Sequence, residues 1–326
     1  DLHRVDRRQR QMCIRDSVRV VFMGTPEFSV PVLEMLINNY NVVGVVTQPD
    51  RLVGRKRILT PSPIKQLALQ HDIPVATLEK VRLQYQEVLD FNPDIIVTCA
   101  YGQIIPNEIL NYPKFGCINV HASLLPEYRG GAPIQRAIMN GEVKTGITIM
   151  YMNEGMDTGD IIDKEELIIG NDDNFDEVSE NLSNIGASLL QDVLPNIIEG
   201  KAKRIIQDNS EATYAPIIKR EDEKLDFNKT SFELHNQIRA LSTVPGAYAV
   251  LDGKVVKIYS SRISSHIHPE KANGEIVKIY DDGIGISTED SELIITDIKV
   301  EGKNRVSVKQ FLNGKKEEDL LGKVFE

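Results

Sequence analysis

Residues 18–47 read VRVVFMGTPEFSVPVLEMLINNYNVVGVVT, and this stretch decides the fold. Its opening apolar run, residues 18–23, is typical of a buried strand, and residues 42–47 form a second run of the same kind. Between them, residues 30–39 carry apolar side chains at helical spacing. A strand, a helix and another strand in this order make the unit from which parallel sheets are built.

The same alternation continues toward residue 207. Further strands are predicted at residues 94–100, 116–120 and 146–152, and further helices at 63–71, 133–138 and 173–199. We therefore predict an α/β fold for a first domain at residues 18–207, with a Rossmann-like doubly wound parallel sheet. Such sheets bind ligands beyond the carboxyl ends of their strands. We expect the functional loops, including the one after residues 146–152, to meet at that edge.

The first loop after a strand argues against a dinucleotide site. It reads GTPEF at residues 24–28 and lacks the second and third glycines of a pyrophosphate-binding loop. The carboxylate of Glu27 would also repel phosphate. We therefore expect no NAD site there.

The pattern changes after residue 207. A charged segment at residues 208–230 predicts a linker, and residues 231–241 predict a short helix. Short strands are then predicted at residues 247–251, 255–259, 274–280, 283–287 and 292–300. This succession predicts a second, smaller domain at residues 231–326 that contains a β-barrel.

Composition sets limits on the class of protein. The 326 residues suit two globular domains, and the net charge of −10 argues against nonspecific nucleic-acid binding. No apolar run approaches the roughly 18 to 20 residues that a membrane span needs. The three cysteines, Cys13, Cys99 and Cys117, lack CxxC spacing, so neither a disulfide framework nor a metal site is expected. We interpret Cys99 and Cys117 as buried apolar residues and expect a reducing cytoplasm.

Residues 1–17 differ from the rest of the chain. They are polar and rich in arginine, and they lack the apolar core of a signal peptide. Residues 11–17, QMCIRDS, match the translation of a transposon-end sequencing adapter. We therefore expect residues 1–17 to be a non-native, disordered leader.

Two polar residues stand at the end of the strand at residues 116–120. Side chains two apart in a strand face the same way, so Asn119 and His121 are expected to project side by side. An amide donor next to a proton acceptor that titrates near neutrality is suited to acyl-group chemistry. The loop that follows contains Arg129 and Gly130 before a helix opens with Pro133, which is typical of a ligand-facing surface.

The segment NVHASLLP at residues 119–126, followed by RGGAPIQ at 129–135, resembles the signature of 10-formyltetrahydrofolate-dependent formyltransferases. Other segments fall in the order of that family: FMGTPEF at 22–28, VTQPD at 46–50, AYGQIIP at 100–106, GMDTGD at 155–160 and ATYAP at 212–216. The resemblance runs from about Val18 to the C-terminus. It implies a catalytic domain at residues 18–207 and an OB-like domain for tRNA at residues 231–326.

The resemblance also implies a catalytic trio. Asn119 would donate a hydrogen bond to the developing oxyanion, and His121 would take the proton of the attacking amine. Asp157 matches the position of the family's catalytic carboxylate and would support His121, either directly or through an ordered water. For an isolated aspartate beside glycines, a role in a turn would be the first interpretation.

The co-substrate implied is 10-formyltetrahydrofolate, with no metal. Its expected site has two sides, formed by residues 101–106 and by the loop after Asn119 and His121. The candidate residues are Tyr101, Gly102, Ile104, Ile105, Ser123, Leu124, Leu125, Pro126, Arg129 and Gly130. For Ile104 and Ile105, burial in the core is an equally good interpretation, and only their backbone is implicated.

The acceptor implied is initiator methionyl-tRNA. Residues 50–61, DRLVGRKRILTP, are basic within an acidic protein and show no helical or strand period, so we expect a loop. They match the family's insertion that enters the acceptor arm. The expected tRNA-binding residues are Arg51, Arg55, Lys56, Arg57, Lys303 and Arg305.

Alternatives remain open at this stage. The same catalytic trio would serve a formyltransferase acting on glycinamide ribonucleotide or an amino sugar nucleotide, or a 10-formyltetrahydrofolate hydrolase. A non-catalytic tRNA- or folate-binding protein would be favoured if His121 or Asp157 were absent. The basic loop and the C-terminal domain favour tRNA as acceptor. We expect a monomeric cytoplasmic enzyme without a DNA or membrane partner.

Overall fold

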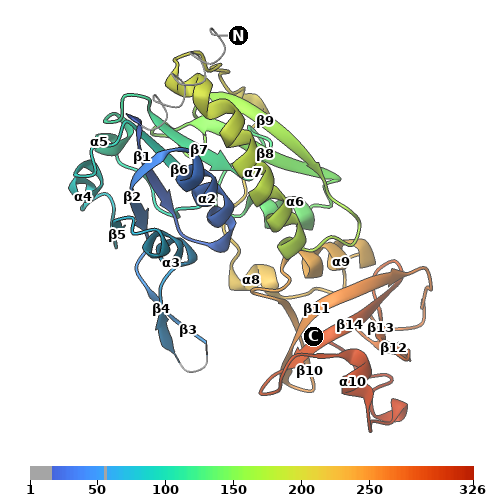
Figure 1. The fold of residues 1–326 in the computed structure, drawn as a ribbon. Coiled ribbons are helices and arrows are strands. Elements are labelled where there is room, and N and C mark those ends of the chain that lie inside the picture. The colour runs from blue at the N-terminus through green and yellow to red at the C-terminus, as the bar shows by residue number, and fades with distance from the viewer. Residues whose placement is uncertain (1–16, 55–56) are drawn as a thin grey trace, which may run out of the picture. The chain divides into compact units, whose positions relative to one another are not determined.

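The computed structural model describes residues 17–54 and 57–326. Residues 1–16 lie outside this part, so the interpretation of the leader stays a prediction. The chain divides into two compact units (Figure 1). The N-terminal unit contains the described residues up to Gly131 with 145–167 and 179–215, and the C-terminal unit contains 132–144, 168–178 and 216–326. The domain limits at residues 207 and 231 stay a prediction, and two segments from within 18–207 belong to the C-terminal unit.

A mixed sheet of seven strands forms the centre of the N-terminal unit, in the order β5-β2-β1-β6-β7-β8-β9. The strands are β1 (Arg19–Gly24), β2 (Asn41–Thr47), β5 (Val75–Thr77), β6 (Ile95–Cys99), β7 (Cys117–His121), β8 (Lys144–Tyr151) and β9 (Ile161–Ile168). The first five strands in the order pair in parallel, which confirms the Rossmann-like prediction there. β8 departs from the predicted parallel arrangement, because it pairs antiparallel with β7.

Helices cover both faces of this sheet. On one face, α4 (Tyr85–Leu89) and α5 (Asn107–Leu110) pack against Val21 and Met23 of β1. The alternate residues Val20 and Phe22 are fully buried as well, so the strand has no solvent-facing side. The predicted helices appear as α2 (Val30–Asn39), α3 (Pro63–Gln70) and α7 (Phe175–Ile198). Gly186 of α7 lets the helix approach β7, because a Cβ there would lie 2.9 Å from Val120.

A two-stranded hairpin projects from the N-terminal unit at residues 51–60 (Figure 1). Its strands are β3 (Arg51–Val53) and β4 (Ile58–Thr60), paired antiparallel with Leu52 opposite Leu59. The prediction of a loop without strands is therefore wrong for this segment. Arg55 and Lys56 lie outside the described residues.

The C-terminal unit contains a six-stranded antiparallel sheet, in which the five predicted strands appear and a sixth, short strand is added. Closure of this sheet into a barrel stays a prediction. Its strands are β10 (Ala247–Leu251), β11 (Lys254–Ser264), β12 (Ile276–Ile279), β13 (Ile284–Ser287), β14 (Glu292–Val300) and β15 (Val306–Ser307). The predicted helix is α9 (Ser231–Ala240), where Thr230 and Glu233 form a reciprocal capping box. Leu234 and Ile238 of α9 pack with Ile258 and Leu293 of the sheet in one apolar core. The unit also contains α6 (Pro133–Met139), α8 (Arg220–Glu223) and α10 (Val308–Leu312).

The described residues contain neither a candidate membrane span nor a cluster of metal-ligating side chains. None of their helices combines the length and the apolar character that crossing a membrane requires. Within residues 17–54 and 57–326, no group of three or more His, Cys, Asp or Glu side chains is arranged to hold a metal ion.

Candidate active site

Asn119 and His121 lie on β7, which is flanked by β6 and β8 in the middle of the sheet. Because side chains alternate along a strand, the two residues share one face, as predicted. His121 is only 6% exposed, and Asn119 is partly buried. A rigid central strand therefore fixes both side chains and keeps them largely away from bulk water.

The hydrogen bonds of His121 identify its basic nitrogen. Nε2 lies 3.1 Å from the carbonyl oxygen of Tyr128. A carbonyl oxygen only accepts hydrogen bonds, so Nε2 carries the proton in this contact. In the neutral imidazole, Nδ1 is then the free proton acceptor. Nδ1 faces Oδ1 of Asp157 at 3.7 Å, where a carboxylate stabilises the protonated ring.

Asp157 reaches His121 from an unexpected direction. Because β8 is antiparallel, its last residue, Tyr151, pairs with Ile118 near the start of β7. The segment after β8 therefore begins at the edge where the parallel strands start, and not, as predicted, at the edge where they end. It then runs back over the sheet to His121. The backbone N–H of Gly130 donates to Oδ2 of Asp157 at 2.8 Å, which leaves Oδ1 for His121. Asp157 has a left-handed backbone, with φ of +54°.

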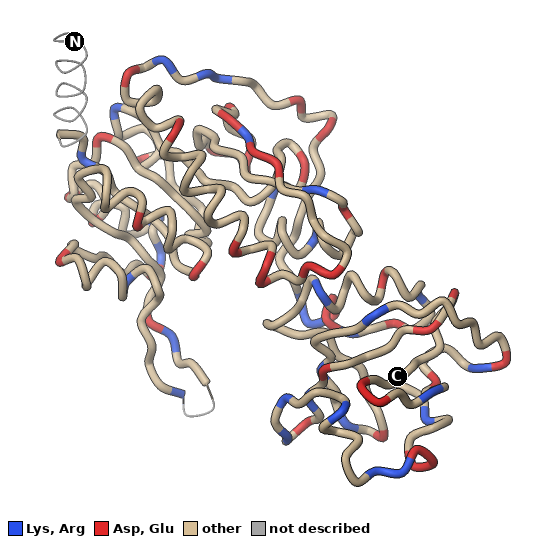
Figure 2. The backbone as a smooth tube through the Cα atoms, turned by 45° about the vertical axis from the view of Figure 1, so that its right-hand side comes forward, with Lys and Arg blue, Asp and Glu red and all other residues tan. Residues whose placement is uncertain are grey.

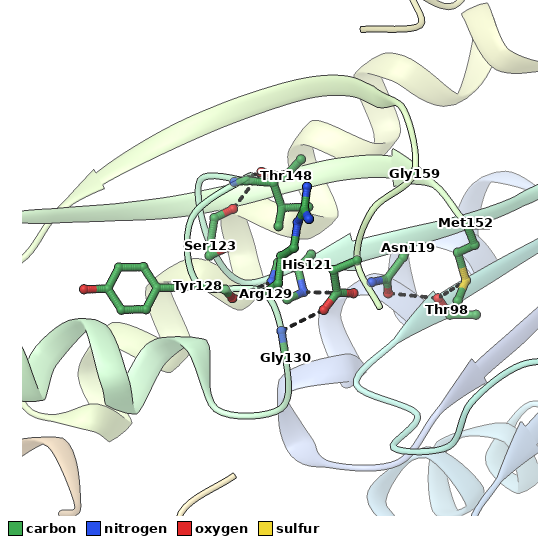
Figure 3. Close-up of polar contacts among 12 residues, drawn as sticks. Thr98, Asn119, His121, Ser123, Tyr128, Arg129, Gly130, Thr148, Met152 and Gly159 are labelled. Carbon is green, nitrogen blue, oxygen red and sulfur yellow. Dashed lines mark hydrogen bonds and ion pairs between the residues drawn. The ribbon is translucent and has the colours of Figure 1, made fainter. Parts of the chain in front are cut away.

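The amide of Asn119 is oriented from the neighbouring strand. The hydroxyl of Thr98 on β6 lies 2.9 Å from Oδ1 of Asn119, and the Thr98 side chain is buried. In Figure 3 the amide oxygen of Asn119 points toward Thr98 and the nitrogen points to the side of His121. No residue in the described part of the chain forms a hydrogen bond with Nδ2 of Asn119. That N–H group is free to donate to a bound substrate.

Arg129, one of the expected folate residues, has a buried side chain that is only 2% exposed. Its Nε and Nη2 donate to Oε1 of Gln207 at 3.2 and 2.7 Å, and Nη2 also donates to Oδ1 of Asn209. A buried charge held by this many hydrogen bonds is a structural group. The guanidinium is therefore directed into the protein.

The other expected folate residues divide into two groups. Tyr101, Ile105, Ser123 and Leu125 are buried, whereas Ile104 is 86% exposed. The remaining four, Gly102, Leu124, Pro126 and Gly130, are exposed or partly exposed. Burial raises the pKa of Tyr101 to about 12, so its phenol stays protonated at neutral pH. Of the two isoleucines for which burial in the core was an equal interpretation, Ile105 is buried and Ile104 is not.

Gly130 is constrained in two ways. Its φ is +123°, and a Cβ there would lie 2.7 Å from the carbonyl oxygen of Ala215. We expect Gly130→Ala to lower the free energy of unfolding by about 1–3 kcal/mol, since that backbone region is essentially restricted to glycine. Gly200→Ala is a matched control, because Gly200 also has a positive φ but has open space around it. Thermal unfolding would measure both, and equal losses would contradict the role of the Ala215 contact.

The expected tRNA residues lie in both units. Arg51 and Arg57 are exposed on the projecting hairpin, and Lys303 is exposed in the C-terminal unit. Arg305 is already paired, with Nε and Nη2 donating to the two carboxylate oxygens of Asp297 at 2.9 and 3.0 Å. Figure 2 shows basic and acidic residues interspersed over the C-terminal unit. The hairpin therefore offers the less neutralised positive charge.

Sequence reasoning did not identify three residues that support this site. Thr98 orients Asn119, Gln207 binds Arg129, and Gln48 donates from Nε2 to the carbonyl oxygen of Tyr101 at 2.9 Å. Gln48 lies within the segment VTQPD, so the resemblance already drew attention to it. For Thr98 the signal was a lone hydroxyl in an apolar strand, which needs a partner when buried.

Cys99 and Cys117 are buried, as predicted from their apolar surroundings. Burial raises the pKa of each thiol to about 12. Both therefore remain neutral thiols at physiological pH, and neither acts as a nucleophile.

Known proteins are similar to this chain in sequence and in fold. The chain matches two family models, Formyl transferase at residues 18–194 and Formyl transferase, C-terminal domain at residues 217–316. It is 51% identical over 311 residues to the methionyl-tRNA formyltransferase of Bacillus subtilis (strain 168), covering 93% of this chain and 98% of the relative. It is 52% identical over 305 residues to that of Bacillus cereus (strain B4264), covering 92% and 97%. A solved N-formyltransferase from Helicobacter canadensis, in complex with folinic acid and dTDP-3-aminofucose, has a similar fold. That match has a TM-score of 0.65 and 24% identity, and it covers 85% of this chain and 98% of the other.

Proposed function

The chain belongs to the formyl transferase family, and we propose that it transfers the formyl group of 10-formyltetrahydrofolate to the α-amino group of initiator methionyl-tRNA. The observation that carries this proposal is the meeting of Asn119, His121 and Asp157 at one face of β7, where His121 is buried and Asn119 is partly buried. An amide donor and a carboxylate-supported base are the groups that formyl transfer to an amine requires.

The proposed mechanism assigns one task to each residue. The amine attacks the formyl carbon, and the bond from this carbon to N10 of the folate then breaks, so that tetrahydrofolate leaves. Nδ2 of Asn119 donates to the formyl oxygen as negative charge develops on it. Nδ1 of His121 takes the proton that the amine loses and passes it to N10, and Oδ1 of Asp157, at 3.7 Å, stabilises the imidazolium in between. No step requires a nucleophilic side chain of the protein.

The loop at residues 101–106 is suited to one side of a folate. Ile104 presents an apolar side chain, and Gly102 brings an exposed stretch of backbone without a Cβ. Gln48 Nε2 would lie 2.6 Å from a Cβ at Gly102, so the loops after β2 and β6 are closely packed there. A flat heteroaromatic ring needs an apolar contact of this kind together with nearby backbone donors and acceptors. On the other side we propose Leu124, Pro126 and the backbone of Gly130.

The projecting hairpin supports tRNA as the acceptor. It exposes Arg51 and Arg57 together with Leu52 and Leu59, which are 53% and 62% exposed. An isolated two-stranded hairpin is marginal in water, and apolar side chains on one indicate a surface that a partner covers. Basic side chains directed at phosphates supply most of the affinity for nucleic acid.

We expect the triple substitution Arg55→Ala, Lys56→Ala, Arg57→Ala to raise the KM for methionyl-tRNA by at least tenfold. Each lost phosphate contact also reduces, by about one, the slope of the logarithm of tRNA affinity against the logarithm of salt concentration. The KM for the folate should stay unchanged. Steady-state kinetics at several salt concentrations measure these quantities. An unchanged KM for tRNA would contradict the proposed role of the hairpin.

One assay tests the proposed function and separates its alternatives. Methionyl initiator tRNA, glycinamide ribonucleotide and an amino sugar nucleotide are each offered with 10-formyltetrahydrofolate. We expect formylation of the tRNA alone, and formate release without acceptor would indicate a hydrolase. The amino sugar nucleotide is included because the solved Helicobacter canadensis protein is described with dTDP-3-aminofucose.

Charged tRNA is used where ribosomes act, so we propose the cytoplasm as the site of the reaction. The monomeric state stays a prediction.

A further inference from the structure

We propose that Gln207 is a positioning residue, which holds Asp157 in place for His121 by linking its loop to the buried Arg129. This inference rests on the proposed function, because it assigns Asp157 a part in the reaction. Gln207 lies far from the catalytic segments in sequence and forms no hydrogen bond with Asn119 or His121.

The amide of Gln207 uses its full capacity for hydrogen bonds. Nε2 donates to the carbonyl oxygens of Asp157 and Gly159, both at 2.8 Å. Oε1 accepts from Nε and Nη2 of Arg129. Two donors and two acceptor lone pairs are all that a primary amide offers. Gln207 is 6% exposed, so losing any of these partners would leave a buried polar group unsatisfied.

These contacts close a ring around Asp157. Gly130, which follows Arg129, donates its backbone N–H to the carboxylate of Asp157. Arg129 itself, through Gln207, holds the backbone carbonyl of the same residue. Asp157 is thus held at its side chain and at its main chain by two consecutive residues, one of them acting through Gln207. Such support is needed, because a left-handed φ of +54° costs energy in a residue other than glycine.

The substitution Gln207→Glu separates the two halves of this link. Glutamate keeps an acceptor for Arg129 but replaces the donating amide with an oxygen that faces two carbonyl oxygens. We expect kcat to fall roughly tenfold or more, because small displacements of catalytic groups have large effects, while both KM values stay within about twofold. Asn209→Ala is the matched control, since it removes another acceptor of Arg129 and leaves the Asp157 loop untouched. It should keep wild-type kinetics.

The split between kcat and KM separates a positioning role from a binding role. An unchanged kcat in Gln207→Glu, a loss that falls on the KM values instead, or an equal loss of kcat in Asn209→Ala would each overturn the proposal.

Amide hydrogen exchange at residues 155–160 gives a test that does not depend on activity. We expect faster exchange there in Gln207→Glu than in the wild type, and no change in Asn209→Ala. If Gln207→Glu does not fold, Gln207→Asn takes its place, because the shorter amide cannot reach both Arg129 and the loop. Unchanged exchange in the variant that folds would overturn the proposal. A wild-type protein that fails to formylate methionyl-tRNA would instead contradict the proposed function.

Discussion

Replacing Asn119 with alanine is expected to lower kcat for formyl transfer by about a hundredfold or more. A single donor to a developing oxyanion contributes about 3–4 kcal/mol in a site of this kind. The effect should fall on kcat rather than on KM, because the formyl oxygen becomes strongly negative only as the amine attacks. Steady-state kinetics with saturating folate would measure the loss, and a loss below threefold would contradict the role of Asn119.

Folding should survive this substitution. Thr98 loses Asn119 as a partner, but its hydroxyl also lies 3.2 Å from the carbonyl oxygen of Ile118 and stays satisfied. Thr98→Val provides a graded comparison, since it keeps the amide of Asn119 and removes the hydroxyl that orients it. One neutral hydrogen bond is worth about 0.5–1.5 kcal/mol, so the loss in kcat should not exceed about tenfold. Thr98→Ser should restore the rate. If Thr98→Val lost as much as Asn119→Ala, orientation rather than donation would account for both.

The fold could be predicted where the apolar pattern is strong. The run at residues 18–23 and the helix Val30–Asn39 follow from periodicity, and the structure has both. The strand β9 was missed because half of its sequence, IIDKEELI, is charged and most of it is exposed, as suits a strand at the edge of a sheet. The hairpin at residues 51–60 was missed because its strands have three residues each, too short for a period.

The residues of the candidate active site could likewise be predicted only in part. Asn119 and His121 are local in sequence, so the alternation of a strand was enough to place them together. The route of Asp157 was not predictable, because sequence patterns do not distinguish a parallel from an antiparallel β8. The direction in which the Arg129 side chain points could not be predicted either. Arg129 sits in a loop that looks ligand-facing, and only Gln207 and Asn209, about eighty positions further on, reveal that its guanidinium points inward.

The second large effect is expected from His121→Gln, which should lower kcat by about a hundred- to ten-thousandfold. Glutamine places its own Nε2 close to the position of the histidine Nε2, so the hydrogen bond to the carbonyl of Tyr128 can persist. What it removes is the basic nitrogen at the Nδ1 position, which faces Asp157. The substitution therefore removes the basic nitrogen and keeps the hydrogen bond to Tyr128, so it tests the two roles of His121 separately. His71→Gln is the matched control, since His71 is exposed in the same unit.

The size of the loss tests the assignment of the base to Nδ1 of His121. His71→Gln should keep the wild-type rate. A loss of kcat below about tenfold in His121→Gln would mean that another group accepts the proton of the amine. Asp157 would then be the first residue to test, because its carboxylate is already in place beside the amine-accepting face of β7.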